Sequence, residues 1–309
     1  MSKSVSRSIG LTLARIALAA GCVAGVADAA PLKVVATTSM VADLVRQVGG
    51  ERVKIDGLMG AGVDPHLYKA STQDVVRMQH ADVIFYNGLL LEGKMGDLLT
   101  RMARSKKGGV YAVTESIPEE LLLSPKEFAG HHDPHVWLDV SLWARCVETV
   151  AEGLSAQDPE GAAYFKTRAE ATRASLADLH AWALAKTAEL PPERRILITS
   201  HDAFNYFGRA YGFDVVGLQG ISTVTEAGLA DMARMVDLIR NRGARAIFVE
   251  SSVPPQAIQR IAADAGVRVG GELFSDAMGT PGEIEHGYDL GTYNGMIRHN
   301  LNTIVEALR

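Results

Sequence analysis

The chain has 309 residues, of which 47% are hydrophobic and 22% charged, and its formal net charge is −5. This composition excludes a wholly disordered chain, and the acidic balance argues against a nucleic-acid-binding surface, which needs a basic excess. Two cysteines are too few for a disulfide scaffold or a four-thiolate zinc site. The length exceeds that of one typical core and predicts two lobes.

Residues 1–29 are typical of a secretory signal peptide. Lys3 and Arg7 precede a short apolar stretch, and residues 27–29 (Ala-Asp-Ala) have the small-x-small pattern at which signal peptidase cleaves. Cleavage after Ala29 removes three basic residues and one acidic residue, which changes the formal net charge to −7. We therefore expect export to the periplasm. A lipoprotein anchored through Cys22 ranks second, because the leucine before it lies one place too early for the usual lipobox.

Short apolar segments alternate with helical ones in the first half, a pattern that predicts parallel βα units. We expect strands over residues 33–38, 53–58, 83–86 and 110–113, and helices over residues 40–48, 71–80 and 98–104. Ser39 is predicted to cap the first helix. The remaining cysteine of the mature chain, Cys146, lies in a helical context, which predicts a buried and unreactive thiol.

A single long helix is predicted over residues 159–190. Asp158 and Pro159 have the residue types of an N-cap and a first helical position, and two prolines follow Leu190. Its apolar residues recur at helical spacing, namely Phe165, Ala169, Thr172, Leu176, Leu179, Ala183 and Leu190. The βα pattern then resumes, with strands expected over residues 195–199, 214–218, 246–249 and 267–269 and helices over 226–242 and 293–308. The chain is therefore α/β, with two similar halves around a long helix.

The tripeptide Asp-Pro-His occurs twice, ending at His66 and at His135, and its proline stiffens the loop from which the histidine projects. His201 and Asp276 each follow a predicted strand. Because ligands of open α/β sheets bind outside the carboxyl ends of strands, these four residues can converge between the halves. Three imidazoles and one carboxylate suit zinc and accept manganese or iron.

Simpler explanations remain open at this point. A histidine after proline is commonly a turn residue, and spacing alone does not separate a metal site from scattered structural histidines. Asp133 and Asp202 are candidate caps or partners that orient imidazoles. Three explanations are open for His131 and His132, namely spare ligands, a metal-capture loop or merely a polar turn. We interpret the other four histidines as structural, namely His80, His180, His286 and His299.

Four ordered motifs carry a family resemblance, namely DPHLY at 64–68, DPHVWLD at 133–139, TSHDAFNYF at 199–207 and GELFSDA at 271–277. The chain resembles the periplasmic metal-binding (solute-binding) proteins of zinc/manganese/iron ABC transporters, cluster A-I, and is most similar to their TroA-like branch. The similarity runs from residue 31 to residue 309. Glu92 and residues 87–89, 249–252 and 294–297 also fit.

The resemblance implies two α/β lobes, each with a mainly parallel β-sheet flanked by helices, joined by one long α-helix with a metal ion in the cleft. The chain then divides into residues 1–29 (signal peptide), 30–158, 159–190 (linking helix) and 191–309. The implied metal ligands are His66, His135, His201 and Asp276, and no catalytic residue is implied. The implied function is high-affinity capture of Zn²⁺ or Mn²⁺, with Fe²⁺ also possible, and delivery by a monomer to an ABC permease and its ATPase at the inner membrane.

The resemblance leaves the metal open. Some manganese-preferring members have glutamate at the position of His201, whereas zinc-specific members often carry a long histidine-rich loop that residues 121–132 lack. A bidentate Asp276 would favour manganese. We expect both metals to bind, zinc more tightly, with affinity falling below about pH 6.5, the ordinary histidine pKa. We also expect only a modest tilt of the lobes when the metal leaves.

Two other classes of protein are alternatives. A zinc hydrolase would use Glu250 as its best candidate base, but the sequence has no His-Glu-x-x-His motif, glycine-rich phosphate loop or nucleophile elbow. A metal-stabilised surface adhesin would leave metal uptake unchanged when its gene is deleted.

Overall fold

A computed structural model describes residues 30–106, 109–128 and 130–309. The predicted signal peptide, with Cys22, lies outside the described residues. Contacts between Cα atoms group residues 31–309 into one unit. In the described ranges, none of the helices combines the length and the apolar character that a membrane crossing requires.

The first half is built on a parallel four-stranded sheet in the order β2-β1-β3-β4. Its strands are β1 (Leu32–Ala36), β2 (Val53–Gly57), β3 (Val83–Tyr86) and β4 (Val110–Ala112), and its helices are α1 (Ser39–Gly49), α2 (Thr72–His80) and α3 (Gly96–Ser105). Because successive side chains of a strand point to opposite faces, Val34 packs in the core with α1 while Val35 packs in a second core with α2 and α3. This sheet is therefore covered on both faces.

The strands of this half confirm the sequence prediction, but the predicted helix cap was wrong. Thr38, not Ser39, is the N-cap of α1, because Thr38 still has extended backbone and its side chain accepts a hydrogen bond from the backbone N–H of Val41. Ser39 is the first residue of the helix.

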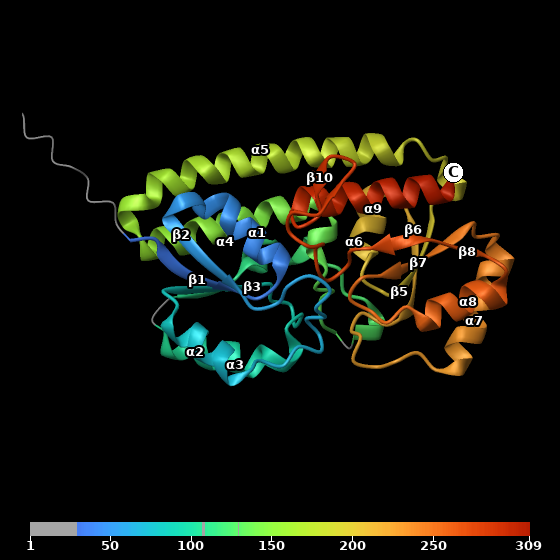
Figure 1. The fold of residues 1–309 in the computed structure, drawn as a ribbon, viewed down its shortest axis with the longest axis horizontal. Helices are drawn as coiled ribbons and strands as arrows, with labels where there is room; N and C mark the ends of the chain where they lie inside the picture. Colours follow the sequence, from blue (N-terminus) through green and yellow to red (C-terminus); the bar gives the residue numbers. More distant parts are fainter. Residues whose placement is uncertain (1–29, 107–108, 129) are drawn as a thin grey trace, which may run out of the picture. The chain divides into compact units, whose positions relative to one another are not determined.

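The long helix is shorter than predicted. After α4 (Val140–Gln157), residues Pro159–Gly161 form a 3₁₀ turn, and the α-helix α5 runs over Ala162–Thr187 for 26 residues. Asp158 starts the turn by accepting the N–H of Gly161 at 3.0 Å. The predicted apolar positions are all buried. At ~1.5 Å per residue the helix is about 39 Å long, and it packs against α1 of one half and α9 of the other (Figure 1).

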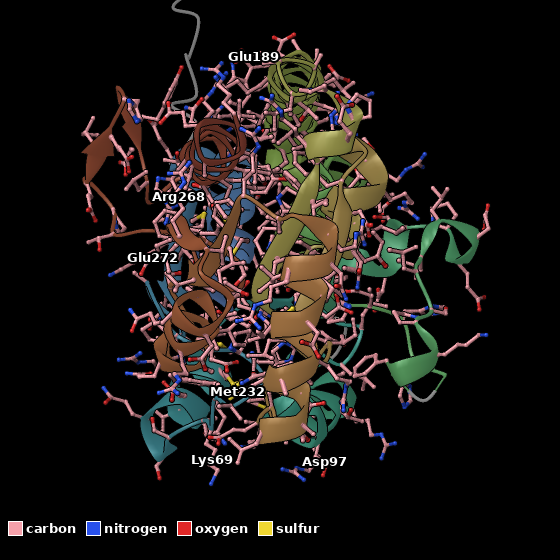
Figure 2. All side chains as sticks on the ribbon, turned by 90° about the vertical axis from the view of Figure 1, so that its right-hand side faces the viewer. Lys69, Asp97, Glu189, Met232, Arg268 and Glu272 are labelled. Atoms are coloured by element: carbon pink, nitrogen blue, oxygen red, sulfur yellow. The ribbon has the colours of Figure 1, made fainter. Side chains whose placement is uncertain are left out.

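The second half contains two parallel strand pairs, with β5 beside β7. Its elements are β5 (Ile196–His201), α6 (Asn205–Tyr211), β6 (Asp214–Gln219), α7 (Leu229–Arg242), β7 (Ala246–Glu250), α8 (Gln256–Ala265), β8 (Arg268–Leu273), the hairpin β9 (Ile284–Glu285) and β10 (Tyr288–Asp289), and α9 (Tyr293–Leu308). In Figure 2 the right-hand side of Figure 1 faces the viewer, with Met232 of α7 towards the viewer and Glu189, just beyond the end of α5 at Thr187, at the top. We call the parts before and after α5 the N-terminal and C-terminal lobes; the limits at residues 158 and 191 stay a prediction.

Candidate metal centre

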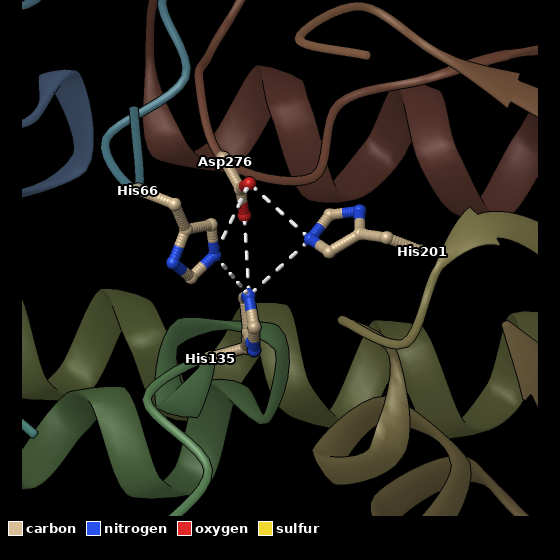
Figure 3. Close-up of side chains that lie close together, drawn as sticks. All are labelled: His66, His135, His201 and Asp276. Carbon is tan, nitrogen blue, oxygen red and sulfur yellow. Dashed lines mark hydrogen bonds and ion pairs between the residues drawn. The ribbon is translucent and has the colours of Figure 1, made fainter. Parts of the chain in front are cut away.

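Four side chains from both lobes meet in the interior, and they are the four that the sequence singled out. His66 lies in the loop after β2, His135 lies just before the 3₁₀ turn Val136–Leu138, His201 is the last residue of β5, and Asp276 follows β8. Their exposed fractions are 3% for His66, 0% for His135 and His201, and 1% for Asp276, so the cluster is shielded from solvent. One ligand atom of each lies within 4.8 Å of the others (Figure 3).

The spacing of the ligand atoms fits a small cation. Nε2 of His135 lies 3.4 Å from Nε2 of His66 and 3.4 Å from Nε2 of His201. The carboxylate of Asp276 lies 3.7, 3.4 and 3.2 Å from Nε2 of His66, His135 and His201, respectively. A tetrahedral ion with bonds of about 2.0–2.1 Å holds its ligands roughly 3.3 Å apart. The four groups therefore surround a space of the right size.

The chemistry of the donors also fits a cation. Both carboxylate oxygens of Asp276 are buried, and in the described part of the chain neither accepts a hydrogen bond of normal geometry. Buried polar atoms without partners are costly unless something else satisfies them. Oδ1 of Asp276 faces His135, while Oδ2 faces His66 and His201. Both oxygens are thus directed into the same space as the imidazoles.

Two of the imidazoles are oriented by carboxylates on their outer side. Nδ1 of His135 lies 2.7 Å from Asp133, and Nδ1 of His201 lies 2.5 Å from Glu250. A carboxylate at Nδ1 fixes the hydrogen on that nitrogen, so in the neutral ring the Nε2 lone pair points inward. Of the two roles left open for Asp133, a cap or a partner of an imidazole, its contact with Nδ1 of His135 fits the second, and Glu250 makes the same kind of contact with His201.

His66 is held differently. Its backbone N–H donates to Oδ1 of Asp64 at 2.8 Å, and Oδ2 of Asp64 accepts a hydrogen bond from the hydroxyl of Thr223 at 2.6 Å. Among the described residues, no carboxylate contacts Nδ1 of His66. The ring is therefore restrained through its backbone and not at its outer nitrogen.

The surroundings of the three histidines shift their pKa values in different directions. Burial lowers the pKa of His66 to about 3, in spite of the opposing effect of Asp276. Burial also disfavours charge on His135, but the carboxylates of Asp133 and Asp276 outweigh it and raise its pKa to about 9. Glu250 and Asp276 likewise overcome burial and hold the pKa of His201 well above its ordinary value. The neighbouring carboxylates therefore favour the protonated form of His135 and His201, whereas burial favours the neutral form of His66.

The other candidate residues lie outside this cluster. Among the described residues, neither His131 nor His132 belongs to the cluster of His66, His135, His201 and Asp276, and His132 contacts Ser124 near the surface. The histidines predicted to be structural pack or bond elsewhere: His180 contacts Tyr211, and His299 contacts Glu285. Cys146 is fully buried, as predicted, and burial raises the pKa of its thiol.

Sequence reasoning missed the residues that reach across from the opposite lobe. Thr223 bonds Asp64, and Nδ2 of Asn205 donates to Oδ2 of Asp133 at 3.2 Å. A third connection runs from Nε1 of Trp137 to the backbone carbonyl of Ser275 at 2.8 Å. Of these residues, Thr223 lies outside every motif, so no pattern in the sequence indicated its role.

Comparison with known proteins identifies relatives over nearly the whole chain. The manganese-binding lipoprotein MntA of Bacillus subtilis is 44% identical over 283 residues, which are 90% of each chain. The zinc-binding protein TroA of Treponema pallidum is 46% identical over 287 residues, covering 91% of this chain and 90% of TroA. The solved structure of the periplasmic zinc-binding protein TroA aligns with a TM-score of 0.84, at 45% identity, over 90% of this chain and 99% of that one.

The similarity to TroA confirms the fold class, with parallel sheets flanked by helices in two lobes and one long helix between them. A profile of the family described as "ZnuA: Zinc-uptake complex component A periplasmic" matches residues 34–307. These relatives are named for metal binding and uptake and not for catalysis, which confirms the prediction of a binding protein. The chain belongs to the ZnuA family of periplasmic metal-uptake components.

Proposed function

We propose that this protein captures one divalent transition-metal ion, zinc or manganese, outside the cytoplasm and delivers it to an ABC permease and its ATPase. The observation that carries the proposal is the buried cluster of three imidazoles and one carboxylate, whose ligand atoms are spaced for a metal ion. The ligands would be His66, His135, His201 and Asp276. Two come from each lobe, so the bound ion would join the lobes.

The donor set supports both metals, with iron a further candidate. Three imidazoles favour zinc, because affinity at nitrogen-rich sites rises along the series from manganese to zinc. Both oxygens of Asp276 face the centre, which offers the additional oxygen ligand that manganese prefers. The relatives support the same pair, since MntA is named for manganese and TroA for zinc.

We further propose that the working protein is a monomer and that it is exported. From the sequence alone, anchoring through Cys22 ranked second. Several relatives, MntA among them, are named as lipoproteins, which favours a lipid anchor at Cys22. A lipid on Cys22 would hold the protein at the membrane near its permease. Mass spectrometry of the mature N-terminus distinguishes the two: a lipidated Cys22 supports the anchor, and an N-terminus at Ala30 supports a free periplasmic protein.

The experiment that tests transport is metal accumulation in a strain lacking the gene. We expect uptake of radioactive zinc or manganese to fall, and to recover with the wild-type gene and with His80→Ala, which alters an exposed histidine outside the cluster. His66→Ala should fail to restore uptake. Normal accumulation in the deletion strain would contradict the proposal and favour a surface adhesin.

A further inference from the structure

The two Asp-Pro-His tripeptides use their aspartates in the same way. In each, one carboxylate oxygen accepts the backbone N–H of the histidine two residues later, at 2.8 Å for His66 and 2.9 Å for His135. The other oxygen accepts a side-chain donor from the C-terminal lobe, which is Thr223 for Asp64 and Asn205 for Asp133. Each aspartate therefore connects a histidine of one lobe to the opposite lobe.

The two connections differ in how much else restrains the histidine. Asp133 is fully buried, and besides the backbone N–H it contacts Nδ1 of His135 at 2.7 Å. Asp64 contacts His66 only through the backbone N–H, among the described residues. The position of His66 therefore depends more heavily on the second bond of its aspartate, the one that Thr223 donates.

The carboxylate of Asp64 is also the more exposed of the two, because Asp133 is fully buried whereas Asp64 is half-buried. Asp64 and Thr223 both line a cavity of about 300 Å³. The bond from Trp137 to Ser275 is buried, whereas those from Asn205 to Asp133 and from Thr223 to Asp64 are half-buried. Water in this cavity can compete for Asp64 once the hydroxyl of Thr223 is removed. Water can therefore reach the carboxylate of Asp64 more readily than that of Asp133, so the connection through Thr223 is the easier of the two to break.

We propose that Thr223 is a positioning residue that slows metal release, because its hydroxyl fastens Asp64, and through it His66, to the C-terminal lobe. This inference rests on the proposed metal site. It assigns to Thr223 an effect on retention of the ion rather than on its arrival. Loss of the hydroxyl removes none of the four ligands. It does let the loop that carries His66 move away from the ligands of the other lobe.

The test is the rate at which Zn²⁺ and, separately, Mn²⁺ pass from the loaded full-length protein to an excess of a chromogenic chelator. Thr223→Val removes the hydroxyl at nearly constant volume and should raise the dissociation rate about tenfold, equivalent to ~1.4 kcal/mol, with little change in the association rate. Thr223→Ser keeps a hydroxyl and should restore slow release. Thr225→Val makes the same change at an exposed position of the same loop and should release metal like the wild type.

A double-mutant cycle separates positioning from a general loss of stability. Asp64→Asn keeps an oxygen for the N–H of His66 and weakens the bond to Thr223, so combining it with Thr223→Val should add little to either single change. Additive effects, or a Thr223→Val protein that releases metal as slowly as the wild type, would overturn the inference while leaving the metal site intact. A wild-type protein that binds neither ion would overturn both this inference and the proposed function.

Discussion

Glu250 accepts two hydrogen bonds from one histidine: His201 donates its backbone N–H to Oε1 at 2.9 Å and its Nδ1–H to Oε2 at 2.5 Å. Both residues are buried, and Glu250 is the last residue of β7, the strand beside β5. The neighbouring strand thereby fixes both the position of His201 and the direction of its ring. A carboxylate in this place also increases the basicity of the imidazole as a metal ligand.

The first prediction concerns this carboxylate. Glu250→Gln keeps the size of the side chain but removes its charge, so we expect zinc affinity to fall by about tenfold to hundredfold while the fold persists. Competition with a chelator of known affinity measures the change, and circular dichroism checks the fold. Glu272→Gln, an exposed position on β8, is the matched control and should bind as the wild type does. Unchanged affinity in Glu250→Gln would show that the carboxylate does not act on the metal ligand.

The second prediction concerns protons released by metal binding. The carboxylates of Asp133 and Asp276 raise the pKa of His135 to about 9, and those of Glu250 and Asp276 hold the pKa of His201 well above its ordinary value, so both shifts favour a second proton on these rings at neutral pH. Metal must displace these protons, and we expect about two to be released per ion. Calorimetry in buffers of different ionisation enthalpy counts them. Binding heats that do not depend on the buffer would contradict this picture.

The same pKa shifts move the pH range in which affinity changes. From the sequence we expected affinity to fall only below about pH 6.5, the ordinary histidine pKa. Because protonation of His135 persists up to about pH 9, affinity should instead rise steadily from neutral pH to about pH 9. Measuring zinc affinity from about pH 6, near the ordinary histidine pKa, to about pH 9, the raised pKa of His135, tests this. An affinity that levels off at pH 7 would favour ordinary histidines.

The third prediction concerns the choice of metal. Asp276 supplies the oxygen atoms of the cluster, and manganese depends on oxygen ligands more than zinc does. Asp276→Asn should therefore weaken Mn²⁺ binding by about 100-fold and Zn²⁺ binding by about tenfold, figures taken from the usual range for altered metal sites. Parallel titrations with the two ions compare the losses. Equal losses for both ions would mean that the second oxygen of Asp276 has no part in selectivity.

The fourth prediction concerns motion between the lobes. The indole N–H of Trp137 donates to the carbonyl of Ser275, and the hydroxyl of Tyr293 donates to the carbonyl of Trp137 at 2.6 Å; all three residues are buried. These bonds and the helix α5 do not involve the metal, so they should persist without it. Small-angle scattering curves of stripped and loaded protein should nearly coincide. A large increase in the radius of gyration on metal removal would show that these bonds break.

Much of the architecture was predictable from local patterns. Buried parallel strands such as β3 read as short apolar runs, and the regular spacing from Phe165 to Ala183 marked the buried face of the long helix. The ends of that helix were less predictable, because Asp158 and Pro159 are as compatible with a 3₁₀ turn as with an α-helix. The choice depends on hydrogen bonds of single residues rather than on a repeating pattern.

The four side chains that converge in the candidate site could be predicted from the sequence, but the residues that hold them in place could not. His201 lies at the end of a strand and Asp276 follows one, and the carboxyl ends of parallel strands meet, so convergence could be expected. The family motifs then selected three of the nine histidines, together with Asp276. Asn205 and Thr223 contact partners 72 and 159 residues away in the sequence. Contacts over such separations leave no periodic pattern in the sequence, so only the folded chain could show them.

The most direct test of the metal centre is the metal content of the native protein, purified from its own cell envelope and dialysed under one fixed condition. Elemental analysis by mass spectrometry should find one zinc or manganese ion per chain in the wild type and in His80→Ala, and far less in His66→Ala, which removes one of the four converging ligands. A wild-type protein without metal, or a His66→Ala protein that retains as much as the wild type, would contradict a metal site at these four residues.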